Sequence, residues 1–77
     1  MRKNKMVEDV DFALTVWRFI QYDLETTKYN EAKARMLADK FETAISTPVR
    51  WATGIACPHP MVRKQIMDFI ELQSRQP

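Results

Sequence analysis

The stretch LADKFETAISTPVRWATG, residues 37–54, decides how the chain folds. Within it, Ser46 and Thr47 stand directly before a proline. Ser or Thr followed by proline is a helix-start signal, because proline is tolerated in the first turn, where its missing N–H has no partner. Gly54 is the only glycine of the chain, and it can supply the left-handed residue that ends a helix. The stretch therefore predicts a short helix that ends at about Thr53.

Further helices are expected on both sides of this short one. Asn30 can cap a preceding helix through its side-chain oxygen, and Pro60 can open a following one. The apolar face of the preceding helix comprises Ala34, Leu37, Ala38, Phe41 and Ala44. The buried side of the following helix comprises Val62, Ile66, Phe69, Ile70 and Met61, and the tail from Gln73 is expected to fray.

Two apolar stripes run along the expected first helix. One has steps of four and three residues and comprises Met6, Val10, Ala13, Trp17, Ile20 and Leu24. The other comprises Phe12, Val16 and Phe19, and lies roughly 120° away around the helix. Two interpretations remain open: both stripes lie in one monomer core, or the second stripe is shared with a partner. We carry Phe12, Val16 and Phe19 forward as a predicted dimer contact.

Length and composition predict one small folded domain that spans residues 1–77. The chain is 45% apolar and 29% charged, which is typical of a folded protein rather than a disordered one. A single cysteine cannot form an internal disulfide, and no uncharged run is long enough for a signal-peptide core or a membrane span. We therefore expect a soluble cytoplasmic all-α domain of four helices, or five, with a basic N-terminal arm over residues 1–5 and no membrane partner.

Cys57 and His59 are the only cysteine and the only histidine, two residues apart across a proline. A zinc site needs four ligands, or three and a water molecule. A nucleophilic Cys–His pair needs direct contact and a third, orienting group. The sequence thus predicts no metal, no cofactor and no enzymatic activity here, with Cys57 as a small apolar filler.

The run of residues 37–60 resembles the Cro and phage-repressor type (XRE-like) of helix-turn-helix. The residues that match the family pattern without a gap are Leu37, Ala38, Phe41, Ser46, Thr47, Arg50, Trp51 and Gly54. The resemblance places a helix-turn-helix at about residues 31–54. The chain departs from the pattern at Glu42, where the family turn has glycine. It also departs at Pro48, which occupies a position that is normally apolar and inward, and at Val49, which occupies one that is normally polar and outward. An alternative inward face made of Ile45, Val49 and Ala52 would turn Trp51 toward the surface.

The resemblance implies a small sequence-specific DNA-binding transcriptional regulator, phage-repressor-like in kind. A recognition helix at about residues 46–53 would enter the major groove of double-stranded DNA, and the protein would be a homodimer. The expected DNA-contacting residues are Ser46, Thr47, Arg50, Thr53, Arg63 and Lys64. The alternative is a small helical protein-binding inhibitor or adaptor with no DNA role. The net charge of only +2 and the second aromatic stripe favour that alternative.

Overall fold

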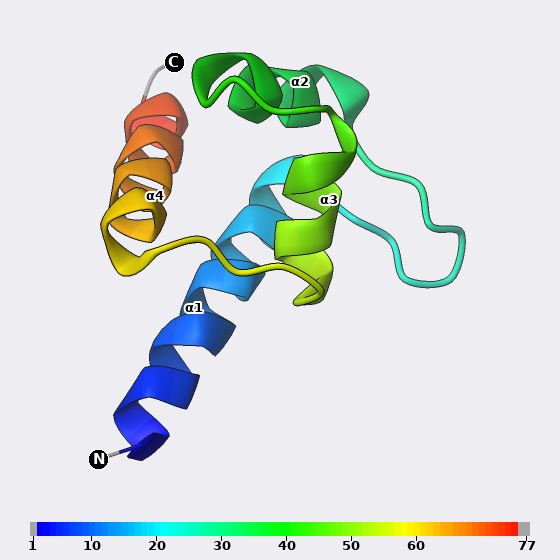
Figure 1. The fold of residues 1–77 in the computed structure, drawn as a ribbon. Helices are drawn as coiled ribbons and strands as arrows, with labels where there is room; N and C mark the ends of the chain where they lie inside the picture. The colour runs from blue at the N-terminus through cyan, green and yellow to red at the C-terminus, as the bar shows by residue number, and fades with distance from the viewer. Residues whose placement is uncertain (1, 76–77) are drawn as a thin grey trace.

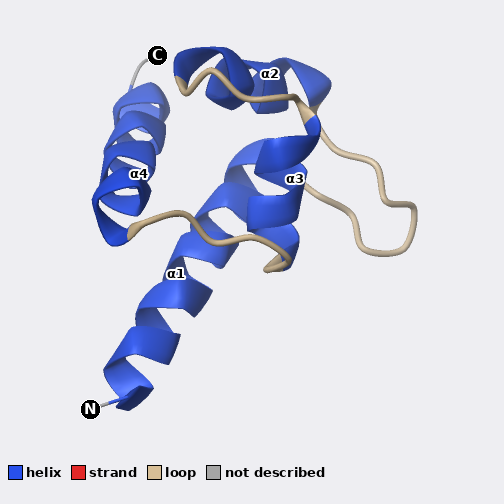
Figure 2. Cartoon of the chain, in the orientation of Figure 1, coloured by secondary structure: helices blue, strands red, loops and turns tan. Residues whose placement is uncertain are grey.

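Residues 2–75 form four helices joined by three connections (Figure 2). The computed structural model describes the backbone of residues 2–75 and the side chains of residues 10–75. The helices are α1 (Arg2–Ile20), α2 (Glu31–Lys40), α3 (Ser46–Thr53) and α4 (Pro60–Arg75). No strand occurs within residues 2–75, which confirms the expected all-α fold.

The long helix α1 is the element on which the others assemble. Its most extensive contact is with α3, and it also contacts α4 and α2. In Figure 1, α4 and α3 lie on opposite sides of α1, α2 crosses the far end, and the first turns of α1 extend beyond the other helices. The backbone is helical from Arg2, so the basic residues expected to form an arm belong to α1 instead. No helix in the described part of the chain is both long and apolar enough to cross a bilayer.

The core corrects the expected roles of the two stripes on α1. Phe12, Val16 and Phe19 were expected at a dimer contact, but each is at most 8% exposed inside the single chain. From the other stripe, Val10 is 53% exposed, whereas Ile20 at the opposite end is buried in the core. Periodicity alone does not show which of the two stripes is buried. The phenylalanines are buried because α2, α3 and α4 all pack against the side of α1 that carries them. Burying one such large side chain contributes about 1.5–3 kcal/mol, so these residues stabilise the monomer.

A chain of aromatic contacts links all four helices. The ring of Trp51 in α3 meets Phe12 of α1 edge-on, with centroids 6.0 Å apart. It also meets Phe41, directly after α2, at 6.4 Å. Phe41 in turn lies 6.1 Å from Phe69 of α4. Edge-to-face pairs of this kind add about 0.5–1.5 kcal/mol beyond their buried area, so the chain of rings fixes the positions of the helices relative to one another.

Three helices end in the same hydrogen-bonded motif. A residue just past each of these helices adopts a left-handed conformation: Gln21 directly after α1 at φ 56°, Glu42 two residues after α2 at φ 56°, and Gly54 directly after α3 at φ 81°. The next amide bonds back to a carbonyl one turn inside the helix, in the pairs Tyr22 to Trp17 (3.2 Å), Thr43 to Ala38 (2.8 Å) and Ile55 to Arg50 (3.0 Å). This is the Schellman arrangement, which satisfies carbonyls that a helix end leaves without partners. It confirms the role predicted for Gly54.

Other helix boundaries show where periodicity misleads. Asn30 caps α2 as expected, since its Oδ1 accepts from the amide of Lys33. Leu24 was expected to continue the first helix, but it lies in the connection after α1 and is exposed. Met61 was expected on the buried side of α4, yet it is 69% exposed. The tail expected to fray from Gln73 is helical through Arg75.

Candidate nucleic-acid interface

The orientation of α3 decides which of its side chains can reach a ligand. Its buried residues are Pro48, Trp51 and Ala52, with Trp51 only 5% exposed. Trp51 is therefore not turned toward the surface, although Ile45, Val49 and Ala52, the alternative inward face, also pack in or against the core. Pro48 takes the inward position that an apolar residue normally fills, because the proline ring is itself apolar and needs no backbone donor in the first turn.

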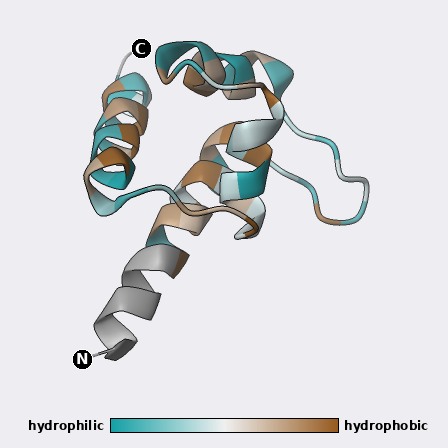
Figure 3. Cartoon of the chain, viewed as in Figure 1, coloured by the Kyte–Doolittle hydropathy of each residue, from teal (hydrophilic) through white to brown (hydrophobic). Residues whose placement is uncertain are grey.

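The opposite side of α3 is a polar stripe made of Ser46, Arg50 and Thr53. All three side chains are exposed, and their spacing of four and three residues aligns them along one face of the helix. In Figure 3, α3 is drawn mostly in white and teal, whereas brown segments occur in α1 and α4. We call Ser46, Arg50 and Thr53 the α3 stripe.

The polar atoms of the α3 stripe differ in what they can offer. The side chain of Arg50 makes no hydrogen bond or ion pair among residues 10–75, so its guanidinium is available to a ligand. The hydroxyl of Thr53 donates to the carbonyls of Val49 and Arg50, at 3.0 and 3.3 Å, and retains only its acceptor capacity. No side chain caps the N-terminus of α3, next to Ser46. Thr47 is half-buried and contributes less surface than expected.

In the sequence around α3, basic residues outnumber acidic ones. No acidic residue occurs between Glu42 and Asp68, while Arg50, Arg63 and Lys64 fall in that interval. Glu42 itself is exposed in the turn before α3. It holds φ at 56°, the left-handed conformation for which the family pattern has glycine. The turn thus has the backbone that a glycine would give, but at a cost in strain and with one added negative charge.

Arg63 was expected at the DNA surface, and the structure corrects this. The residue is 8% exposed, and its Nη1 donates to the carbonyl oxygen of Pro58 and to Sγ of Cys57, both at 3.1 Å. A buried guanidinium must be hydrogen-bonded, and this one ties α4 to the connection that precedes it. Cys57 is exposed beside it, so the expectation of an apolar filler is also wrong.

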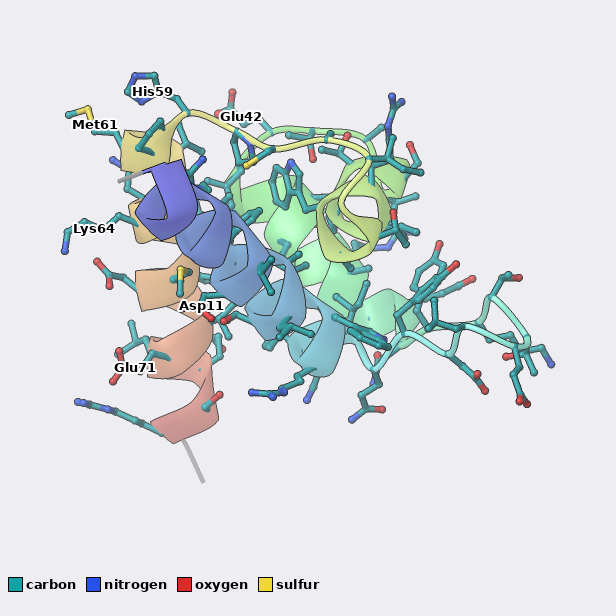
Figure 4. All side chains as sticks on the ribbon, turned by 90° about the horizontal axis from the view of Figure 1, so that it is seen from below. Asp11, Glu42, His59, Met61, Lys64 and Glu71 are labelled. Carbon is teal, nitrogen blue, oxygen red and sulfur yellow. The ribbon has the colours of Figure 1, made fainter. Side chains whose placement is uncertain are left out.

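His59 and Lys64 have roles set by α4. Nδ1 of His59 accepts the amide of Met61 at 3.1 Å, so the imidazole caps the first turn of α4. Lys64 is exposed, but Figure 4 shows it pointing outward from α4, on the side of α1 away from α3. The structure therefore does not bring Lys64, an expected DNA contact, to the α3 stripe.

One further surface feature was missed from the sequence. A groove of about 710 Å³ lies between α1 and α4, lined in part by Asp11, Thr15, Lys64, Asp68 and Glu71. Figure 4 shows Asp11 and Glu71 near one another across it. The spacing of four and three between Lys64, Asp68 and Glu71 was a signal for one charged face of α4. That α1 borders this face depends on tertiary packing.

The described residues contain no group of three or more His, Cys, Asp or Glu side chains placed to hold a metal ion. Comparison with known proteins adds no family assignment. The chain matches no protein-family model, and neither the curated proteins nor the solved structures contain a match to it.

Proposed function

We propose that this chain is a small sequence-specific DNA-binding transcriptional regulator that inserts α3 into the major groove. The observation that carries the proposal is the α3 stripe: Ser46, Arg50 and Thr53 are exposed along one side of a helix whose other side is fixed in the core. The major groove is about 12 Å wide and admits an α-helix presented in this way.

Arg50 is the main candidate for reading a base. An arginine can donate two hydrogen bonds to O6 and N7 of guanine, a contact worth about 1–3 kcal/mol of discrimination against other bases. The guanidinium of Arg50 is exposed, and α3 carries no acidic residue to neutralise it. Ser46 lies one turn earlier, at the uncapped N-terminus of α3, where a hydroxyl and the positive end of the helix dipole favour a phosphate.

The test is fluorescence anisotropy of wild type and Arg50→Ala on duplexes selected from a random pool and on scrambled duplexes, at several salt concentrations. A base contact predicts a loss of about 1–3 kcal/mol on the selected site and relaxed choice at one base pair. A contact to phosphate alone predicts an even loss on all duplexes, with the salt slope reduced by about one unit.

Lys64→Ala is the matched control, because it also removes one positive charge from an exposed site but lies away from the α3 stripe. We expect its affinity to stay close to that of wild type. Identical titrations for wild type and Arg50→Ala would remove α3 from the interface. Absence of salt-dependent binding by the wild type would overturn the DNA proposal as a whole.

A second candidate is a protein-binding inhibitor or adaptor with no DNA role. It is favoured by Ile55 and Met61, which are 71% and 69% exposed near the two ends of the connection from α3 to α4. Exposed apolar side chains mark a protein-binding surface where they form one contiguous patch, so this candidate requires Ile55 and Met61 to act together. A folded wild type that binds no duplex at low salt would make this candidate the stronger one.

A further inference from the structure

The groove between α1 and α4 has the size and length of a binding cleft. Its volume of about 710 Å³ falls within the range of about 300–1,000 Å³ that ligand clefts occupy. It is bordered by α1 at Asp11 and Thr15, and by α4 from Pro60 to Ser74. This stretch of α4 is about 21 Å long, which is the length of nearly four turns of a second helix. We call this space the α1–α4 groove.

The base of the α1–α4 groove is apolar. Ile70 is buried, and Met67 is half-buried and packs against the core, yet both side chains also line the groove. Water over such a surface is displaced favourably by apolar side chains, at about 25 cal/mol per Å². The base therefore favours an occupant that presents a row of aliphatic groups.

The polar groups of the α1–α4 groove accept hydrogen bonds and have little left to donate. The hydroxyls of Thr15 and Ser74 donate to backbone carbonyls of their own helices, at 2.8 and 3.1 Å. The guanidinium of Arg63 donates to the connection before α4. The remaining polar lining includes carboxylates, which only accept when ionised. A matching ligand must therefore supply donors.

The charge of the groove rim calls for a cation. Asp11 on α1 and Asp68 on α4 are both exposed, and neither carboxylate has an ion-pair partner among residues 10–75. Glu71 adds a third acid, which pairs with Arg75 over 3.1 Å. Lys64, the exposed base of the lining, points outward from α4 in Figure 4. One unpaired carboxylate thus stands on each wall of the groove.

A helix meets these requirements better than an extended peptide. The backbone carbonyls of an extended segment would find few donors in the groove, and a buried polar group without a partner costs about 1–3 kcal/mol. A helix satisfies its own backbone groups. It can also carry an apolar row at steps of three and four residues, with basic side chains on both flanks of that row.

We propose that the α1–α4 groove binds an amphipathic helix of another protein. Its apolar row lies over Met67 and Ile70, and its lysines or arginines meet Asp11 and Asp68. Seating an amphipathic helix in a groove is a recurring mode of recognition. Because α3 and α4 lie on opposite sides of α1 (Figure 1), the α3 stripe stays open when the groove is filled. The proposal therefore does not depend on DNA binding.

The test uses the whole chain and a synthetic helical peptide of about 15 residues, long enough to span the groove. The peptide carries leucines at steps of three and four, flanked by lysines. Anisotropy of the labelled peptide should give a dissociation constant of about 10–100 µM, and amide shifts in nuclear magnetic resonance should change chiefly in α1 and α4. A peptide with glutamates in place of the lysines should bind roughly tenfold more weakly or worse. A peptide with a central proline, which breaks the helix, should lose affinity to a similar extent.

Charge reversals on the protein locate the contact. Asp11→Lys and Asp68→Lys should each weaken the lysine peptide by about three- to tenfold and strengthen the glutamate peptide. Glu25→Lys is the matched control, because it changes the net charge equally at an exposed site. Glu25 belongs to the connection from α1 to α2, which projects away from α4 in Figure 1. Its affinity should stay within about twofold of wild type. Circular dichroism establishes that each variant is folded.

Four results would overturn the proposal. The first is a wild type that fails to bind the lysine peptide at about 1 mM. The second is an equal loss in Glu25→Lys, which would show general attraction between charges. The third is equal binding of the proline peptide, which would show that the occupant need not be helical. The fourth is a change of α1 and α4 shifts on dilution of the protein alone, which would show that a second copy fills the groove.

Discussion

The guanidinium of Arg63 donates to the carbonyl oxygen of Pro58 over 3.1 Å, joining the first turn of α4 to the connection that leads into it. The same Nη1 lies 3.1 Å from Sγ of Cys57. Arg63, which the sequence suggests is an exposed cation, therefore holds α4 against the preceding connection, and its effect on stability can be measured.

Replacing Arg63 should destabilise the fold. Arg63→Met keeps most of the side-chain volume but leaves the Pro58 carbonyl without its charged donor, and hydrogen bonds to charged groups contribute about 1.5–3 kcal/mol. Urea denaturation should show a loss of this size. Lys64→Met, at the exposed neighbouring position, should change stability by no more than about 0.5 kcal/mol. Equal effects of the two substitutions would contradict the role assigned to Arg63.

The imidazole of His59 should act as a helix cap. His59→Ala removes the acceptor for the amide of Met61, and losing a side-chain cap costs about 0.5–2 kcal/mol. His59→Asn and His59→Asp should recover most of the loss, because their oxygens can accept the same amide. Thermal unfolding followed by circular dichroism measures the series. No difference between the alanine and asparagine variants would show that the cap does not stabilise α4.

Glu42 should be a site at which the protein can be stabilised. It adopts a left-handed backbone, which costs a residue with a Cβ about 1–2 kcal/mol. Glu42→Gly removes this strain but adds entropy to the unfolded chain, so we expect a net gain of about 0.5–1 kcal/mol. The denaturation midpoint should rise at constant m value. Glu42→Ala removes the same charge but keeps the Cβ, and should show no comparable gain.

Phe41 should couple α3 to α4. Its ring meets Trp51 on one side and Phe69 on the other. Phe41→Leu keeps an apolar side chain but loses both edge-to-face contacts, each worth about 0.5–1.5 kcal/mol, so a total loss of about 1–3 kcal/mol is expected. Near-ultraviolet circular dichroism should report a changed environment of Trp51. Unchanged stability together with an unchanged spectrum would rule out the coupling.

Local signals in the sequence determined the helix boundaries after residue 29. Asn30, Gly54 and Pro60 act through their own backbone or side-chain geometry, so their effect is independent of what packs nearby, whereas Ser46 begins α3 without a side-chain cap. Each of them stands at a helix end in the structure. The exposed side of α3 was not fixed in this way, because the sequence also allowed an inward face that would turn Trp51 toward the surface.

Only the tertiary structure decided which faces of α1 and α4 are buried. Both stripes of α1 have helical periodicity. The other helices of the chain pack over the stripe that contains Phe12, and Val10 remains exposed. Arg63 is buried because the chain before α4 folds back over it and supplies acceptors, which no local pattern encodes. Hydrophobic periodicity depends on one helix alone, whereas burial depends on the elements that approach it, and those are brought together by residues distant in the sequence.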